Sequence, residues 1–496
     1  MGAVSIPSPK LGRGYRETLL ALTDRWALPA ILVVAGLNFF LQLGSSSYFT
    51  DEAFSVVHSL PGFHEMFHVI GHTETSPWTY FLGLHLWLHV TGSQAEWVTR
   101  LPSAIAGVAL VGATYWMAGA FIPRRAALAA AALTAISPLI GSYAQETRVY
   151  VFLMLAVVVS VGATVRGVQR TDGRNRLLAL GALTAFLAMW LHYTALSVVV
   201  PLIVWVATRR SLSLRQRAAF IGVCVVGVGT VLPLLLEQYH YQPNGGFITG
   251  AINWQNVVSV VGTPFGTRRG TPVDVRTVVA AVLMVCSALA VLLRPHNPAM
   301  RERGLLVVLG AFGVLALIGL DLTGKHILIT RYTTIIAPFM LTVLVAACMQ
   351  LPRTAAAALA IPAVVISVWG TVHDHRPAGF YAPTRQVVEY VAPREHPGDF
   401  MLTPGFPIAG IPLFYYDTRR LHPKLGLLGM QDPAVSAVFS RYKRVWIVDW
   451  PNAATDGAAL STATPLLHRF RFRAASVRVF ATSMPLGVVL AVPEGH

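Results

Sequence analysis

The sequence predicts a polytopic α-helical membrane protein that ends in a small α/β domain. Its 496 residues are 54% hydrophobic and only 12% charged, with a mean hydropathy of +0.59, whereas soluble domains carry about 25% charged residues. Many apolar runs are long enough to cross a bilayer, and this apolar character stops after Gly370. These observations indicate a membrane protein rather than a soluble enzyme.

The apolar runs predict about eleven transmembrane helices. They cover residues 27–43, 101–121, 126–142, 149–165, 177–191, 193–208, 218–236, 277–293, 304–320, 334–350 and 355–370. Connections rich in arginine alternate with connections poor in Lys and Arg, as the positive-inside rule requires. The alternation places the N-terminus in the cytoplasm. The basic N-terminal segment lacks a small-residue cleavage site, so the first run is expected to stay as a signal anchor.

The net charge of +16 is explained by the same loops. Because the arginines cluster in short connections between apolar runs, the charge indicates membrane orientation and not nucleic-acid binding. The three cysteines, Cys224, Cys286 and Cys348, all lie inside apolar runs. Disulfides are therefore not expected, and the spacing matches no metal site.

The stretch 77–90 (PWTYFLGLHLWLHV) allows two readings. It is short and rich in aromatic residues, which favours a helix lying on the outer leaflet inside a long first external loop, 44–100. If it crossed the membrane instead, the later basic loops would move outside unless another crossing were hidden. The second reading raises the number of transmembrane helices to as many as 13.

The chain divides at residue 370. Residues 1–370 form the expected transmembrane domain, and residues 371–496 contain strand-like runs (DFMLTPG, RVWIVDW, SVRVFAT, LGVVLAVP) broken by Pro and Gly. Eleven crossings from a cytoplasmic N-terminus place this α/β domain on the exoplasmic side. The external loop 237–276 suits a lid or an acceptor platform, or ordered packing against the exterior domain.

An acidic pair, Asp51-Glu52, comes shortly after the first transmembrane segment and the polar turn 44–47. A carboxylate at the edge of a bilayer costs several kcal/mol to desolvate unless it has partners, so intramembrane carboxylates are candidates for functional sites. The alternative is that the pair caps a short interfacial helix, because acidic residues favour helix N-termini.

Other polar residues are expected on the same outer face. They are His72, Glu74, Arg100, Gln145, Glu146, Arg148, His192, Tyr193, Lys325, His326, Arg331 and Tyr332. Arginines and lysines can bind a lipid-linked phosphate while a carboxylate deprotonates an incoming hydroxyl. A single arginine at the end of a span more often reaches lipid headgroups. The spacing of His58, His64, His68 and His72 leaves a divalent cation open, although no metal site is predicted.

The order of several motifs resembles the GT-C glycosyltransferases. The motifs are DEAFS, SPWTYFLGLHLWLHVTG, RLPSAIAG, SPLIGSYAQETRVYVFLML, LHYTAL and RY, in order over about residues 27–350. More narrowly, they resemble family 39, which includes protein O-mannosyltransferases and lipid A aminoarabinose transferases. The resemblance implies a GT-C transmembrane domain in the bacterial cytoplasmic membrane, with its active site outside.

The resemblance also implies the chemistry. Family members transfer a sugar with inversion from a polyprenyl-phosphate donor, and the first-loop carboxylate, here Asp51 with Glu52 beside it, is catalytic. Arg148, Arg331 and Arg100 match the phosphate-contacting arginines, and Lys325 is expected to assist them. No cofactor is implied with certainty. The expected partners are the lipid-linked donor, membrane lipid, and a lipid, glycan or protein acceptor.

The sequence departs from the family pattern at two places. Thr75-Ser76-Pro77 stands where the family has His-Pro-Pro, and Gln145-Glu146-Thr147-Arg148 replaces Gln-Glu-Ala-Arg. The first change puts the substrate class in doubt more than the mechanism. Two other functions stay open: a lipid or sugar transporter or flippase, and a non-catalytic scaffold with the GT-C fold. The donor sugar cannot be read from the sequence.

Overall fold

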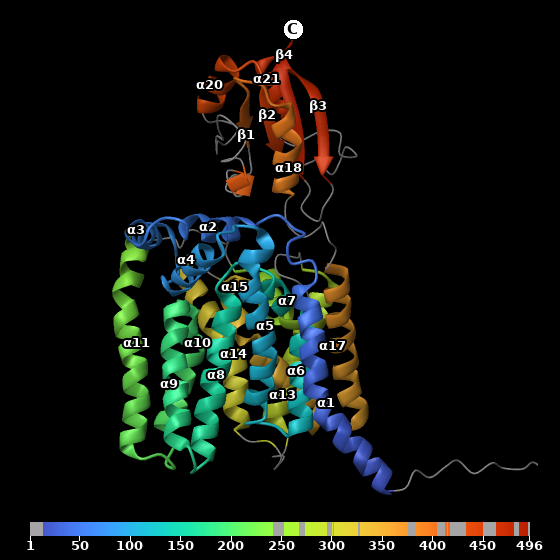
Figure 1. Ribbon diagram of the computed structural model, residues 1–496. Coiled ribbons are helices and arrows are strands. Elements are labelled where there is room, and N and C mark those ends of the chain that lie inside the picture. The colour runs from blue at the N-terminus through green and yellow to red at the C-terminus, as the bar shows by residue number, and fades with distance from the viewer. Residues whose placement is uncertain are drawn as a thin grey trace, which may run out of the picture.

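The computed structural model consists of a helical bundle, a layer of short helices at one end of the bundle, and a C-terminal sheet beyond that layer (Figure 1). The structure describes residues 13–241, 252–266, 273–294, 300, 302–325, 328–374, 383–403, 412–413, 415–416, 433–449, 463–480 and 486–494. His326 and parts of the expected external loop 237–276 lie outside these residues.

The bundle is built from the apolar runs of the sequence. Its helices are α1 (Arg13–Phe40), α5 (Glu96–Ala118), α6 (Arg124–Ala135), α7 (Pro138–Ala144), α8 (Tyr150–Gln169), α9 (Arg174–Leu191), α10 (Leu196–Ala207), α11 (Leu214–Tyr241), α12 (Trp254–Gly266), α13 (Val275–Leu293), α14 (Arg303–Leu320), α15 (Thr330–Thr333), α16 (Ala337–Gln350) and α17 (Arg353–Asp374). Short 3-10 or π turns join some of them: η1 (Tyr193–Ala195), η2 (Asp321–Lys325) and η3 (Thr334–Ile336).

Each predicted transmembrane segment falls on a helix or a pair of helices, but not every one is a long apolar helix. Among the described residues, seven helices are long and apolar enough to cross a membrane, and the bent pair α6–α7 brings the number to eight. Arg25–Phe40 and Tyr193–Ala207 are shorter apolar helices, and α9 has 18 residues and begins with Arg174 and Arg176. Of the eleven predicted spans, seven or eight therefore have the length and composition of a transmembrane helix among the described residues, and the other predicted segments are shorter or less apolar helices.

Three short helices form the layer at the end of the bundle. They are α2 (Thr50–His58), α3 (Phe63–Thr73) and α4 (Thr79–Thr91). The 13 residues of α4 extend about 20 Å, which is less than the roughly 30 Å of a hydrocarbon core. Figure 1 shows α4 with α2 and α3 between the bundle and the C-terminal sheet. This position agrees with a helix that lies along the bundle end.

The expected loop 237–276 contains a helix. Within it, α12 packs against α13, α17 and α7, so this part of the segment belongs to the bundle. At its start, Gln238 of α11 donates to the carbonyls of Ile70 and Ser76 at 3.1 and 3.0 Å. The end of α11 is therefore joined to the layer of short helices.

The C-terminal domain is a four-stranded sheet with helices on both faces. Its strands are β1 (Phe400–Leu402), β2 (Val445–Asp449), β3 (Phe472–Phe480) and β4 (Leu486–Pro493), in the order β1-β2-β4-β3. Strands β1 and β2 are parallel, and the other two pairs are antiparallel. Helix α18 (Thr384–Val391), which is followed by the turn η4 (Ala392–Arg394), covers one face. Helices α20 (Pro433–Arg441) and α21 (Ala463–Phe470) cover the other. All four strand-like runs of the sequence are strands.

The close packing of α8 against α9 depends on Gly181. The Ser160 hydroxyl donates to the carbonyl of Gly181 at 2.8 Å, and a Cβ on Gly181 would overlap the Thr164 hydroxyl and approach the Ser160 carbonyl oxygen to 3.1 Å. Since interiors are packed to the density of organic crystals, neither helix can move away without cost.

We expect Gly181→Ala to destabilise the bundle by about 1–3 kcal/mol, the usual cost of overpacking. Gly222→Ala on α11 is the matched control, because a Cβ there would meet nothing within 4 Å and alanine favours a helix. Thermal unfolding of the two purified variants compares them. An equal midpoint for both would contradict the close contact between α8 and α9.

Candidate active site

The first turn of α2 carries the acidic pair, and Glu52 is its structural anchor. Glu52 is fully buried, and its two oxygens accept from Nε and Nη2 of Arg100, both at 2.8 Å. The same carboxylate accepts from the backbone N–H of Thr147 at 2.9 Å and of Phe49 at 3.0 Å. The bond to Phe49 is one half of a capping box. With four donors on two oxygens, Glu52 is a saturated buried carboxylate.

Arg100 completes this buried ion pair. Its remaining guanidinium N–H groups donate to the carbonyls of Leu43, Ser46 and Ser47 at 2.9–3.1 Å. The side chain is 1% exposed and lines neither of the two cavities described below. The structure therefore places Arg100 and Glu52 in a clamp that fixes the turn before α2. This arrangement does not fit the phosphate contact expected of Arg100, because every guanidinium nitrogen already donates to a buried protein oxygen.

Asp51 faces the other way. Its Oδ2 lies 3.1 Å from Nη1 of Arg331, which belongs to α15. Nη1 of Arg148 donates to the Asp51 carbonyl at 3.1 Å and to the Ser55 hydroxyl at 2.9 Å. Three segments that are distant in the sequence thus bring one carboxylate and two guanidinium groups together.

These groups surround a small polar pocket of about 60 Å³. Its lining residues are Asp51, Phe54, Thr73, Glu74, Thr75, Ser76, Arg148, Tyr150, His192, Arg331 and Tyr332. The positive side of the pocket comes from α15 and from the turn before α8, and its carboxylates come from α2 and the end of α3. Such a pocket can hold an anionic group beside a general base.

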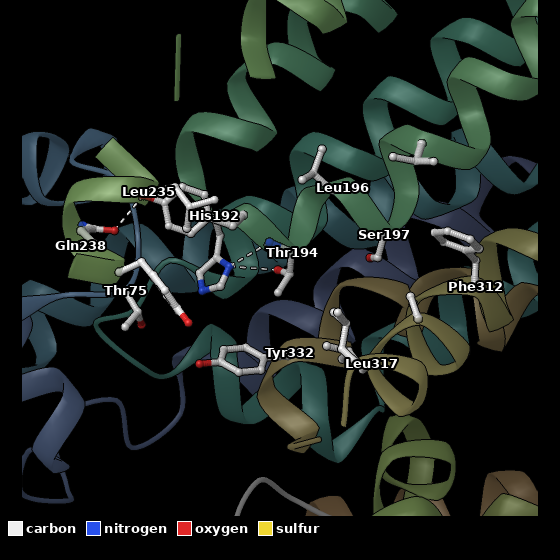
Figure 2. Close-up of a pocket in the computed structure, with 16 residues that line it drawn as sticks. Thr75, His192, Thr194, Leu196, Ser197, Leu235, Gln238, Phe312, Leu317 and Tyr332 are labelled. Carbon is white, nitrogen blue, oxygen red and sulfur yellow. Dashed lines mark hydrogen bonds between the residues drawn. The ribbon is translucent and has the colours of Figure 1, made fainter. Parts of the chain in front are cut away.

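An apolar cavity of about 460 Å³ adjoins the polar pocket. The two share Thr75, His192 and Tyr332. Figure 2 shows His192 and Tyr332 at one end of the cavity, and Leu196, Phe312 and Leu317 farther along it. Helices α10 and α14 supply much of the apolar wall. The combined space is suited to an amphiphilic ligand with a polar head and an apolar tail.

His192 stands where the two cavities meet. Its Nδ1 is bonded to the backbone N–H and the hydroxyl of Thr194, at 3.2 and 3.0 Å. Burial, followed by the charges of Arg148 and Arg331, lowers the pKa of His192 to about 3. The imidazole is therefore neutral at ordinary pH, so the positive charge of this site comes from the arginines.

The other predicted residues have different positions. Glu74 lines the polar pocket and has its Oε1 3.3 Å from Nδ1 of His58. Tyr193 lines the apolar cavity, where its hydroxyl donates to Gln238 at 2.7 Å. Tyr332 lines both spaces.

Three further predicted residues, Gln145, Glu146 and His72, do not line the polar pocket. Gln145 donates to the carbonyls of Asn38 and Phe39 at the end of α1 and to that of Leu41 just after it, at 3.2, 3.4 and 2.9 Å, and so satisfies a helix C-terminus. Glu146 is fully buried. The ring of His72 packs at a tilt against that of Tyr241, with 3.9 Å between ring centroids. Lys325 ends η2, and its side chain lies outside the described residues.

Several lining residues were not singled out from the sequence. Tyr150 follows Arg148 by two positions, and its ring centroid lies 5.6 Å from that of His192, so the spacing within the motif could have identified it. Ser197 lies inside the apolar run 193–208, where the sequence carries no such signal, and Gln238 lies in the segment 237–276, for which an external loop was expected. Within the described part of the chain, no three His, Cys, Asp or Glu side chains form a group that could hold a metal ion.

The buried Glu52–Arg100 pair predicts a specific loss of stability when Arg100 is replaced. Arg100→Met leaves the Glu52 carboxylate buried without its cation, and breaking a buried ion pair costs about 3–5 kcal/mol. The control is Arg209→Met, because the Arg209–Glu302 pair is about 30% exposed and exposed pairs contribute about 0–1 kcal/mol. Thermal unfolding of the purified variants measures both, and equal losses of stability would contradict the role of the clamp.

Comparisons with known proteins add to this geometry. Residues 75–236 match the model of the dolichyl-phosphate-mannose-protein mannosyltransferase family. No curated protein matches the sequence.

Solved structures resemble nearly the whole chain. The oligosaccharyltransferase of Archaeoglobus fulgidus, tethered with an acceptor peptide, is similar with a TM-score of 0.51 and 10% identity, over 94% of this chain and 74% of its own. The mycobacterial arabinofuranosyltransferase AftD is similar with a TM-score of 0.50 and 14% identity, over 99% of this chain and 42% of its own. ArnT from Cupriavidus metallidurans aligns over 96% of this chain and 98% of its own, with a TM-score of 0.45 and 11% identity. The chain has the fold of the GT-C membrane glycosyltransferases, as its motifs predict.

Proposed function

We propose that this protein is an inverting glycosyltransferase that moves a sugar from a polyprenyl-phosphate donor to an acceptor hydroxyl. The observation that carries the proposal is the polar pocket with Asp51, Arg148 and Arg331, which adjoins an apolar cavity of about 460 Å³. A polyprenyl-phosphate sugar has the same two parts, a charged head and an apolar chain.

The donor phosphate would bind Arg148 and Arg331. Guanidinium groups form charge-assisted, often bidentate hydrogen bonds with phosphate. The first prenyl units would lie against Leu196 and Leu317. Support comes from the matched family, whose description names a dolichyl-phosphate sugar, and from the Archaeoglobus oligosaccharyltransferase, which has been solved with dolichol-phosphate. Lys325 stays a proposed phosphate contact on its sequence position alone.

The reaction is a single displacement. The Asp51 carboxylate takes the proton of the acceptor hydroxyl, and the oxygen bonds to the anomeric carbon on the face opposite the phosphate. The bond between that carbon and the phosphate oxygen breaks as the new bond forms. Arg148 and Arg331 stabilise the negative charge that develops on the departing polyprenyl phosphate. Glu52 and Arg100 fix the helix turn that carries Asp51 and do not touch the substrate.

The site would lie on the outer face of a bacterial cytoplasmic membrane. This proposal rests on the alternation of basic loops, together with the position of α2, α3 and the C-terminal sheet at the same end of the bundle (Figure 1). A transporter would need charged groups along a path through the bundle. Here Asp51, Arg148 and Arg331 lie around one pocket instead, and this proximity favours a transferase over a transporter or a non-catalytic scaffold.

We expect the purified protein to consume at least one donor from a panel of polyprenyl-phosphate mannose, glucose, galactose and arabinose. Asp51→Asn should lower turnover roughly 10²–10⁴-fold, the usual contribution of a general base, with donor binding largely retained. Glu65→Gln on the exposed face of α3 is the matched control. Near-normal turnover of Asp51→Asn would exclude the carboxylate as the base.

Arg331→Gln should weaken donor binding roughly 10- to 100-fold, because a hydrogen bond to a charged group contributes about 1.5–3 kcal/mol. Polyprenyl phosphate without sugar is the probe, titrated into protein in nanodiscs. Arg215→Gln, an exposed arginine at the start of α11, should bind it like the unmodified protein. Unchanged affinity of Arg331→Gln would remove Arg331 from the phosphate site.

A further inference from the structure

The C-terminal domain meets the first external loop through a compact set of polar contacts. Arg385, on α18, donates from Nη1 to Oε1 of Glu96 at 2.8 Å, and from Nη2 to the Ser45 carbonyl at 3.3 Å. Its backbone N–H donates to the Ser47 hydroxyl at 3.1 Å, and that hydroxyl donates to Gln386 at 2.9 Å. One turn of α18 is therefore bonded to the segment 45–47.

Tyr416 continues the same contact toward α2. Its hydroxyl donates to Oε1 of Glu96 at 2.8 Å and accepts from the backbone N–H of Tyr48 at 2.9 Å. Burial raises the pKa of Tyr416, so the hydroxyl keeps the proton that it donates. The rings of Tyr416 and Tyr48 are stacked, 6.2 Å between centroids.

The contacted segment also fixes the first turn of α2. Arg100 binds the carbonyls of Ser46 and Ser47, and the backbone N–H of Phe49 is capped by Glu52. Asp51 follows Tyr48 by three residues, which span at most about 10 Å of extended chain. The segment 45–49 is therefore held both by Arg100 of the helical bundle and by the C-terminal domain.

The joint combines polar contacts with the packing of Tyr415 and Tyr416 against Tyr48. A cavity of about 370 Å³ borders it and is lined by Gln94, Glu96, Arg385, Glu389, Tyr415 and Tyr416, among others. Since apolar packing does not fill this space, the position of the segment depends on the hydrogen bonds of a few side chains together with the ring contacts of Tyr48.

We infer that Arg385 and Tyr416 of the C-terminal domain are positioning residues for Asp51, and that docking of this domain sets the geometry of the proposed transfer reaction. The expected effect on catalysis rests on the proposed function, whereas the docking contacts do not depend on it. Neither residue touches the substrate. Both act through the segment 45–49, and a carboxylate displaced by about 1 Å can lose as much as 100-fold in rate.

The test uses the full-length protein in nanodiscs and the variants Tyr416→Phe and Arg385→Met. We expect kcat to fall roughly tenfold in each, while the affinity for polyprenyl phosphate stays unchanged. Hydrogen exchange of the backbone amides of residues 45–52 should become faster in both variants. Arg385→Lys keeps the charge beside Glu96 and should recover part of the turnover.

Tyr390→Phe is the matched control. Tyr390 also belongs to α18, but its ring packs inside the domain, with centroids 6.5 Å from Trp446 and 5.9 Å from Phe480. The control should keep both the kcat and the exchange of residues 45–52.

The outcomes separate the two proposals. Unchanged exchange of residues 45–52 in both variants overturns the inference, and so does faster exchange without a loss of kcat. If the unmodified protein transfers sugar from no donor, the proposed function fails. Hydrogen exchange then still decides whether Arg385 and Tyr416 hold the segment before α2.

Discussion

The buried ion pair between Glu52 and Arg100 is the interaction on which the site depends. It joins the start of α5 to the first turn of α2, and through Thr147 to the turn before α8. Two desolvated charges are costly unless every hydrogen bond is made, and here both groups are saturated by buried partners. The pair therefore holds three chain segments, the first turn of α2, the start of α5 and the turn before α8, in one fixed arrangement. The polar pocket forms where these segments meet.

The two acidic residues in the first turn of α2 have different roles. Adjacent residues of an α-helix point about 100° apart, so Glu52 faces the clamp while Asp51 faces Arg331. The acidic pair thus both caps the helix and supplies a carboxylate to the pocket. The neutral His192 and the ring of Tyr332 then connect the polar pocket to the apolar cavity.

Much of the fold follows from sequence patterns. Long apolar runs form helices because the bilayer requires internal backbone hydrogen bonding, and the short strand-like runs broken by Pro and Gly after residue 370 form strands. The length and aromatic content of the stretch 77–90 favour a helix on the membrane surface over a span, and α4 is a short helix at the end of the bundle. The number of full-length spans was less predictable, because bends such as that between α6 and α7 depend on packing rather than on hydropathy.

For the candidate site, the sequence by itself determined which polar residues stand at the ends of apolar helices on one side of the bundle. Asp51, Arg148, His192 and Arg331 belong to that set, since charges are costly elsewhere in the bilayer. Only the tertiary structure decided which of them meet. In the folded chain, Arg100 pairs with Glu52, Gln145 caps the end of α1, and Asp51 faces Arg331. A hydrogen-bonding partner is chosen by packing across distant segments, and no local pattern records that choice.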